Sequence, residues 1–287
     1  MTPHLFAAAP KPRVAVLSLA SDFGCQVALS NFPQLLESLE TIELVYWQLV
    51  LSADLPDDFD IAIIEGAVTT TEHEQFLLKV RGVAKTIITI GACAGTGGVP
   101  GMIDSQESLK QAQQEVYPSG QEGAGATPVA DARLVPRPVS AVIDVDYTIP
   151  GCPIDSGEFS NILQGALLGV NERTEREPLC AYCKIIEAPC FYLMQGIAVT
   201  SAKAQGAATT ATPCLGLVTQ TGCGALCIGK GRPCTGCRGV AIDANLPAAR
   251  EFVRKAGRSV EEFDAALRVY NSYYLEQRSG DEHHDSA

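Results

Sequence analysis

The sequence predicts an α/β protein, in which a parallel, doubly wound sheet is followed by an irregular, cysteine-rich C-terminal segment. Short β-branched and aliphatic runs alternate with helical stretches through Gly169. Single cysteines follow three of these runs, whereas eight more cysteines crowd into the fifty-eight residues from Cys180 to Cys237. The first half therefore has the pattern of a regular fold, and the second half has the pattern of a ligand-binding segment.

The alternation begins with a strand over Arg13–Leu19, a loop that ends at Cys25, and a helix over Gln26–Leu39. It continues with strands at Glu43–Leu49, Asp60–Ile64 and Thr86–Ile90 and a helix at Glu72–Val80. Strands separated by helices favour a parallel sheet. Ligands gather beyond the carboxyl ends of such strands, where Cys25 and Cys93 lie.

A less regular stretch, Met102–Pro138, loses apolar periodicity, and we expect it to run over the surface or along a partner. A strand at Val139–Val145 is then expected to lead to Cys152, followed by a helix at Glu158–Gly169. Cys152 thus repeats the placement of Cys25 and Cys93.

We place a domain boundary near Asn171, which divides the chain into residues 1–170 and 171–287. Glycine and proline are abundant beyond it, and metal ligation would supply folding energy that such a segment lacks. An amphipathic stretch at Val260–Leu275 ends in a polar tail whose His283 and His284 we interpret as solvated rather than as ligands.

Composition excludes some classes of protein. The net charge of −12 and the lack of a basic run argue against a nucleic-acid partner. No stretch is apolar enough for a membrane span. Because Met1–Pro12 has neither a twin-arginine pair nor an apolar export region, we expect the protein to stay in the cytoplasm.

Eight cysteines of the second half make two sets of four thiolates. They are Cys180, Cys183, Cys190, Cys214, Cys223, Cys227, Cys234 and Cys237. A Cys-x2-Cys pair at each end also suits zinc sites, so the spacing alone leaves zinc and iron–sulfur clusters open. The three cysteines that follow strands favour iron–sulfur clusters, because zinc ribbons do not explain them.

Four ordered motifs resemble the signatures of [NiFe] hydrogenase small subunits. They are Ile64-Glu65-Gly66-Ala67, Gly91-Ala92-Cys93-Ala94, Pro150-Gly151-Cys152-Pro153 and Pro233-Cys234-Thr235-Gly236-Cys237. The resemblance covers roughly residues 13–240, and the motifs around Cys214 and Cys223 look closest to cytoplasmic members. It implies a flavodoxin-like N-terminal domain and three iron–sulfur clusters.

Carried over by position, the resemblance assigns the ligands of each cluster. The proximal set is Asp22, Cys25, Cys93 and Cys152, the medial set is Cys223, Cys227, Cys234 and Cys237, and the distal set is Cys180, Cys183, Cys190 and Cys214. The medial and distal clusters are expected to be [4Fe–4S], since Cys227 stands where three-iron relatives have proline. No nickel ligand is expected in this chain.

Asp22 departs from the family pattern, in which the first proximal ligand is a cysteine. It could ligate iron through oxygen, which we favour, or leave a [3Fe–4S] cluster with a vacant corner. A carboxylate that caps the loop before a helix is the structural alternative.

Other residues carry weaker signals. Glu65 resembles a family glutamate near the proximal cluster, for which a proton relay, an interface role and a plain strand-end carboxylate stay open. Tyr182, Phe191 and Tyr192 are expected to pack around the distal cluster or in an ordinary core. Gly95, Gly97 and Gly98 are not followed by the Lys of a phosphate loop.

The implied function is electron relay between a nickel–iron centre in a large subunit and acceptor subunits near the distal cluster. Hydrogen would be cleaved in the large subunit, so this chain would not itself be catalytic. The alternatives are a cluster subunit of a complex-I-like enzyme, which normally lacks the eight-cysteine tail, and a zinc-stabilised binding module without a redox role.

Overall fold

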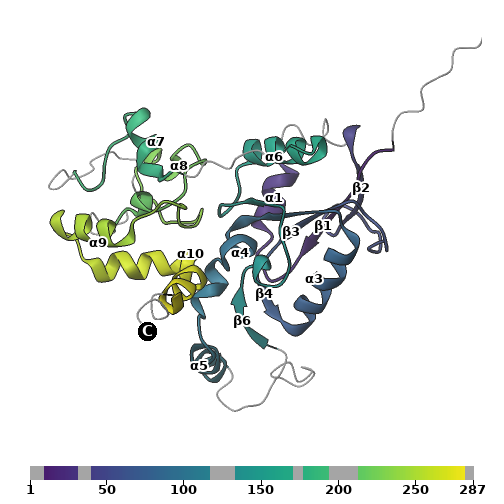
Figure 1. Cartoon of the computed structure of the whole chain (residues 1–287), viewed down its shortest axis with the longest axis horizontal. Helices are drawn as coiled ribbons and strands as arrows, with labels where there is room; N and C mark the ends of the chain where they lie inside the picture. The colour runs from purple at the N-terminus through teal and green to yellow at the C-terminus, as the bar shows by residue number, and fades with distance from the viewer. Residues whose placement is uncertain (1–9, 32–39, 117–132, 171–176, 194–212, 282–287) are drawn as a thin grey trace, which may run out of the picture.

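The computed structural model describes residues 10–31, 40–116, 133–170, 177–193 and 213–281. Its centre is a five-stranded parallel sheet in the order β2-β1-β3-β5-β7 (Figure 1). The strands are β1 (Arg13–Ser18), β2 (Glu43–Trp47), β3 (Ile61–Glu65), β5 (Thr86–Ile90) and β7 (Tyr147–Ile149). Counted within the sheet, this is the flavodoxin-like order, so the predicted α/β fold is confirmed.

Both faces of the sheet are covered, because successive side chains of each strand point to opposite sides. Val14 and Val16 of β1 pack with α1 (Gly24–Ser30) and α6 (Ser156–Leu168). Ala15 and Leu17 pack on the other face with α3 (Thr71–Val83), as Figure 1 shows. The near-continuous apolar strands follow from this burial on both sides.

Several predicted elements are confirmed with shifted ends. The predicted strand Glu43–Leu49 stops at Trp47, where Val50 turns back to donate to the Trp47 carbonyl at 2.9 Å. The helix predicted over Gln26–Leu39 begins at Gly24 and ends at Ser30, with Asn31 as its C-cap, and the rest of the predicted range, residues 32–39, lies outside the described residues.

The predicted strand Val139–Val145 is wrong. Val139–Ala141 forms a single 3₁₀ turn, η3, and the strand that enters the Cys152 loop is β7. Asp146 accounts for the late start, because its Oδ2 accepts from the Ile87 backbone N–H at 2.7 Å and occupies the edge of β5. Strand pairing therefore begins only at Ile88 and Tyr147.

The stretch predicted to be an excursion, Met102–Pro138, contains regular structure that the sequence pattern did not reveal. Helix α5 (Gln106–Val116) lies on the surface with no buried residue. Strand β6 (Arg133–Arg137) pairs antiparallel with β4 (Val68–Thr70). Helix α5 consists mostly of Gln, Glu and other polar residues, and its few apolar side chains, Leu109, Ala112 and Val116, are not buried, which explains why it was missed.

The C-terminal part is built mainly of short elements. These are α7 (Leu179–Ile185), η4 (Leu215–Leu217) and α8 (Leu226–Gly229), followed by the longer α9 (Leu246–Lys255) and α10 (Val260–Asp281). Helix α9 was not predicted. Helix α10 contains the predicted Val260–Leu275, has a kink at Asn271, and contacts α4 (Gly91–Thr96) of the sheet domain.

The predicted boundary at Asn171 and the tail histidines, His283 and His284, lie outside the described residues. No helix in the described ranges is both long enough and apolar enough to cross a membrane.

Candidate metal centres

The carboxyl edge of the sheet brings three predicted ligands together. Cys25, Cys93 and Cys152 follow β1, β5 and β7. Burial raises the pKa of Cys25 to about 12, and the charges of Glu65, Cys152 and Cys93 add to that rise. Burial likewise raises the pKa of Cys93 to about 11, with Cys152 and Asp22 contributing. Such crowded thiols need a cation to stabilise their thiolate forms.

The backbone near Cys25 approaches its sulfur closely. Gly91, the first residue of α4, has φ +85° and lies so close to Cys25 that an added Cβ would be 2.5 Å from its Sγ. Only glycine fits this position. Backbone hydrogen bonds from Ile154 to Cys25 and from Val99 to Cys93 lower the pKa of each thiol against the larger effect of burial.

Asp22 is an exposed residue beside this first site. Its Oδ1 accepts from the Gly24 backbone N–H at 2.9 Å, as a loop-capping carboxylate does. Its charge also contributes to the raised pKa of Cys93, so the carboxylate lies near that thiol. The capping bond uses Oδ1, and ligation of iron through Oδ2 stays a prediction.

Glu65 is the centre of a buried hydrogen-bond network and is only 2% exposed. Oε1 accepts from the Cys25 backbone N–H at 2.9 Å, and Oε2 accepts from Gln26 Nε2 at 2.8 Å. Gln26 also donates to Ser18 Oγ and accepts from Trp47 Nε1 at 2.8 Å. Because both carboxylate oxygens accept hydrogen bonds, Glu65 anchors the first turn of α1, which carries Cys25.

A second group of thiols lies around α7. Burial raises the pKa of Cys180 to about 12, with the charges of Cys214, Cys183 and Cys190 adding to it. A Cβ on Gly216 would lie 3.6 Å from Cys214 Sγ and 3.7 Å from Cys180 Sγ, so both sulfurs flank this glycine. The predicted distal residues are thus neighbours.

The third group surrounds α8 and the loop that follows it. Burial raises the pKa of Cys237 to about 11, and the charges of Cys227 and Cys223 contribute. Cys234 is 7% exposed, and burial together with the charges of Cys214 and Cys237 raises its pKa. Cys234 therefore lies between its predicted medial partners and the distal group.

The three groups adjoin one another. A backbone hydrogen bond from Cys152, in the first group, reaches Cys237 in the third. The backbone N–H of Cys234 donates to Cys214 Sγ at 3.2 Å, which links the third group to the second. The eleven thiols therefore form a continuous series from the sheet edge to α7.

Aromatic side chains pack beside the second group. Tyr192 is 5% exposed, donates its O–H to the Cys214 carbonyl at 2.8 Å, and meets Phe252 edge-on at 5.2 Å. Tyr182 and Phe191 pack against the same apolar cluster. This is the packing expected of them, and it shields the buried Cys214 from water.

The donor set fits iron–sulfur clusters in its chemistry, because soft thiolates with backbone N–H groups directed at their sulfurs characterise such sites. Among the described residues, no three Cys, His, Asp or Glu side chains lie close enough to hold a single metal ion.

Sequence reasoning missed Gln26 and Arg238, which are buried directly after Cys25 and Cys237. A polar residue adjoining a ligand was the available signal.

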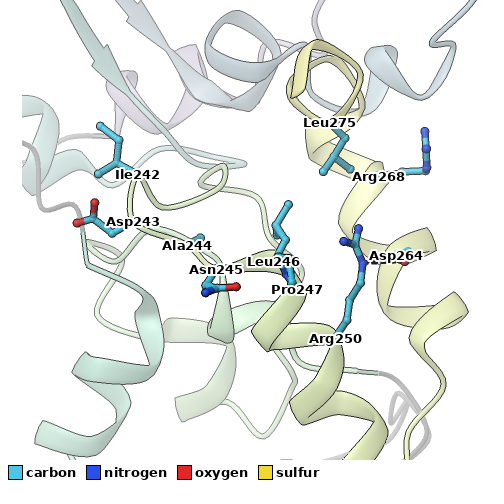
Figure 2. Close-up of a pocket in the computed structure, with 10 residues that line it drawn as sticks. All are labelled: Ile242, Asp243, Ala244, Asn245, Leu246, Pro247, Arg250, Asp264, Arg268 and Leu275. Carbon is cyan, nitrogen blue, oxygen red and sulfur yellow. Dashed lines mark hydrogen bonds and ion pairs between the residues drawn. The ribbon is translucent and has the colours of Figure 1, made fainter. Parts of the chain in front are cut away.

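A separate pocket of about 700 Å³ lies between α9 and α10 (Figure 2). Its lining contains no cysteine and none of the predicted site residues. Arg250 and Arg268 on its wall pair with Asp264 and Asp104. This pocket is therefore distinct from the three thiol groups.

Residues 23–166 match the family described as NADH ubiquinone oxidoreductase, 20 Kd subunit. The match includes the sheet-edge thiols and ends before the eight later cysteines. The chain is also similar to the sulfhydrogenase 2 subunit delta of Pyrococcus furiosus, with 32% identity over 244 residues, which is 85% of this chain and 92% of the relative. An alignment of that length extends into the C-terminal part.

Another relative is the iron-sulfur subunit of the F420-non-reducing hydrogenase of Archaeoglobus profundus, 24% identical over 280 residues, or 85% of each chain. Among solved structures, the Ni-Fe-Se hydrogenase of Desulfomicrobium baculatum matches with a TM-score of 0.51 and 16% identity over 79% of this chain and 94% of that chain. This last likeness concerns the fold.

Proposed function

Because the chain belongs to the family of the NADH ubiquinone oxidoreductase 20 Kd subunit, we propose that it is the iron–sulfur electron-transfer subunit of a hydrogenase. Its hydrogenase relatives, one of them named an iron-sulfur subunit, support this function. The more specific proposal is the small subunit of a [NiFe] hydrogenase, beside a large subunit that holds the nickel site.

We assign the thiols to three clusters. The proximal set is Asp22, Cys25, Cys93 and Cys152, the medial set is Cys223, Cys227, Cys234 and Cys237, and the distal set is Cys180, Cys183, Cys190 and Cys214. When bound, such clusters accept and donate single electrons at potentials that the surrounding protein adjusts. The chain's own contribution is to hold the sulfurs in place, to bury or half-bury eight of the eleven cysteines, and to direct backbone N–H groups at several of the sulfurs.

The continuity of the thiol groups carries the proposal. Cys152 contacts Cys237 through a backbone hydrogen bond, and Cys234 contacts Cys214 in the same way. A protein that needed metal only for folding has no requirement for adjoining sites, whereas an electron relay does. The zinc-module alternative leaves this continuity unexplained.

Glu65 has an anchoring role in this proposal. Both of its oxygens accept from buried N–H donors next to Cys25, so its position fixes the proximal loop. Its predicted role as a proton relay gains no support from these contacts.

The proposal includes partners and a location. The sheet edge with Cys93 and Cys152 would face the large subunit, and acceptor subunits would dock near the distal group. We retain residues 1–170 and 171–287 as the two functional parts. A cytoplasmic location suits the chain, since cysteines that bind iron must not be oxidised to disulfides, and the cytoplasm keeps thiols reduced.

Copurification tests this function. A tagged chain isolated without oxygen should bring down a larger, nickel-containing subunit, and the complex should reduce a dye with hydrogen. The chain alone should not, because catalysis is assigned to the partner. Hydrogen oxidation by the purified chain alone would contradict the proposal, and copurification with quinone-reducing subunits instead would favour the complex-I-like alternative.

A further inference from the structure

Arg238 is a buried cation between two of the thiol groups. It follows Cys237 directly and is 2% exposed. Its Nε donates to the Thr221 carbonyl at 2.8 Å, and its Nη1 donates to the Pro150 carbonyl at 2.9 Å. Thr221 and Pro150 each lie two residues before a predicted ligand, Cys223 and Cys152. One side chain therefore joins the medial loops to the proximal loop.

The charge of Arg238 is paired with Glu158 from the sheet domain. Nη1 donates to Oε2 at 2.7 Å and Nη2 donates to Oε1 at 2.8 Å, which is a two-pronged ion pair. Glu158 lies in the first turn of α6, where Asp155 Oδ1 accepts from its backbone N–H at 2.9 Å. The anion is thus held by the same helix that follows the Cys152 loop.

The neighbouring backbone leaves room for the guanidinium. Gly222 has φ +117°, and an added Cβ would lie 2.3 Å from Arg238 Nη2. Any other residue there would displace the side chain. Gly222 precedes Cys223, so the space that admits Arg238 belongs to the medial site itself.

Arg238 is also close enough to the thiols to affect their charge. Burial lowers its pKa, but the hydrogen bond and charge of Glu158, and then the charges of Cys223 and Cys237, raise it overall. The interaction is mutual, so the cation favours negative charge on these sulfurs and Glu158 opposes it. The pair therefore places two fixed charges of opposite sign next to the medial site.

We propose that Arg238 is a positioning residue which holds the proximal and medial loops together and, balanced by Glu158, sets the reduction potential of the medial cluster. The proposal rests on the proposed function, because it requires clusters at both sites. Ligand residues are unchanged in the variants that test it, so cluster content can be measured separately from potential.

The test is an anaerobic redox titration of the whole hydrogenase complex, monitored by electron paramagnetic resonance. Arg238→Gln should shift the medial potential downward, because a reduced cluster loses a nearby positive charge. Glu158→Gln should shift it upward, because the cation loses its counter-charge. Arg238→Lys should keep the charge and therefore much of the medial potential. It should weaken the magnetic interaction between the proximal and medial clusters, because a single ammonium cannot bond to Thr221, Pro150 and Glu158 at once.

Arg250→Gln is the matched control. Arg250 Nε donates to both carboxylate oxygens of Asp264, at 2.8 and 3.1 Å, in a partly exposed ion pair on the wall of the thiol-free pocket (Figure 2), so loss of this cation should leave the medial potential unchanged. Equal potentials, or shifts in one direction, for Arg238→Gln and Glu158→Gln would overturn the proposal. If Arg238→Gln fails to assemble, an unchanged medial potential in Glu158→Gln overturns it and an upward shift supports it. Lack of iron in the unmodified complex would instead contradict the proposed function.

Discussion

The sheet domain and the cysteine-rich segment, residues 177–243, place their thiols by different means. In the sheet domain, Cys93 and Cys152 follow strands whose positions are set by apolar packing on both faces. In the cysteine-rich segment, the described residues form turns, isolated bridges and helices of at most seven residues. Topology thus arranges the proximal thiols, whereas ligands are needed to arrange the others.

This difference has an energetic meaning. The strands bury continuous aliphatic surface, which stabilises the sheet whether or not metal is bound. The apolar cluster of the C-terminal part includes Cys214 and Cys234 among its buried members and has Cys183 and Cys223 packed against it, whereas the clusters of the sheet domain include Cys25 alone among the predicted ligands. A core that contains ligand thiols loses packing and gains like-charge repulsion when the metal is removed, so metal binding and folding are coupled there.

Removal of iron should have the largest effect, because it tests directly whether the two regions differ in their dependence on ligands. Chelation under reducing conditions is expected to unfold the cysteine-rich segment while the sheet persists. Hydrogen exchange measures both at once: amides of Leu215–Leu217 and Leu226–Gly229 should become unprotected, whereas those of β1, β3 and β5 should stay protected. Equal loss of protection in both regions would show that the sheet also depends on its ligands.

Glu65→Gln tests the anchoring within the sheet domain. A glutamine can present only one oxygen to the two N–H donors that Glu65 now satisfies, so one donor loses its partner. We expect a loss of about 1–3 kcal/mol in the free energy of unfolding, measured by anaerobic urea denaturation. Glu43→Gln, at an exposed position that starts β2, should change stability by less than about 0.5 kcal/mol. Similar values for the two variants would mean that the buried network contributes little.

Asp22 offers the finest distinction, because capping and ligation respond differently to substitution. Asp22→Asn keeps an acceptor for the Gly24 N–H but loses the anionic oxygen, so it should lose about one of the four proximal irons if Asp22 is a ligand. Asp22→Cys should retain that iron and shift the proximal potential alone. Full iron in Asp22→Asn, together with a stability cost of about 1 kcal/mol in Asp22→Ala, would identify Asp22 as a cap.

The sequence predicted the parts of the fold in which local pattern and burial agree. Thr86–Ile90 is a run of five β-branched residues and became an interior strand with the predicted bounds. Val139–Val145 is also rich in apolar residues, yet its buried members Val139 and Ile143 pack beneath the sheet instead of pairing in it. A pattern of apolar residues indicates burial, and pairing is decided by distant residues such as Asp146.

The sequence predicted which residues form the candidate sites, but it did not predict the contacts that join one site to another. Cysteine spacing and the family resemblance named the ligands one by one. No local pattern shows that Arg238 reaches Glu158, eighty residues away, or that the Cys152 backbone meets Cys237. These contacts depend on how the C-terminal part packs against the sheet.

The most direct test is elemental analysis of the intact chain, purified without oxygen, for iron, acid-labile sulfide and zinc. Three clusters held by eleven thiols and Asp22 should contain about twelve irons and about twelve sulfides per chain, or one iron fewer if the proximal cluster has three. Zinc should be absent. About two zinc ions per chain, with little iron and no labile sulfide, would contradict the electron relay and support a structural metal-binding protein.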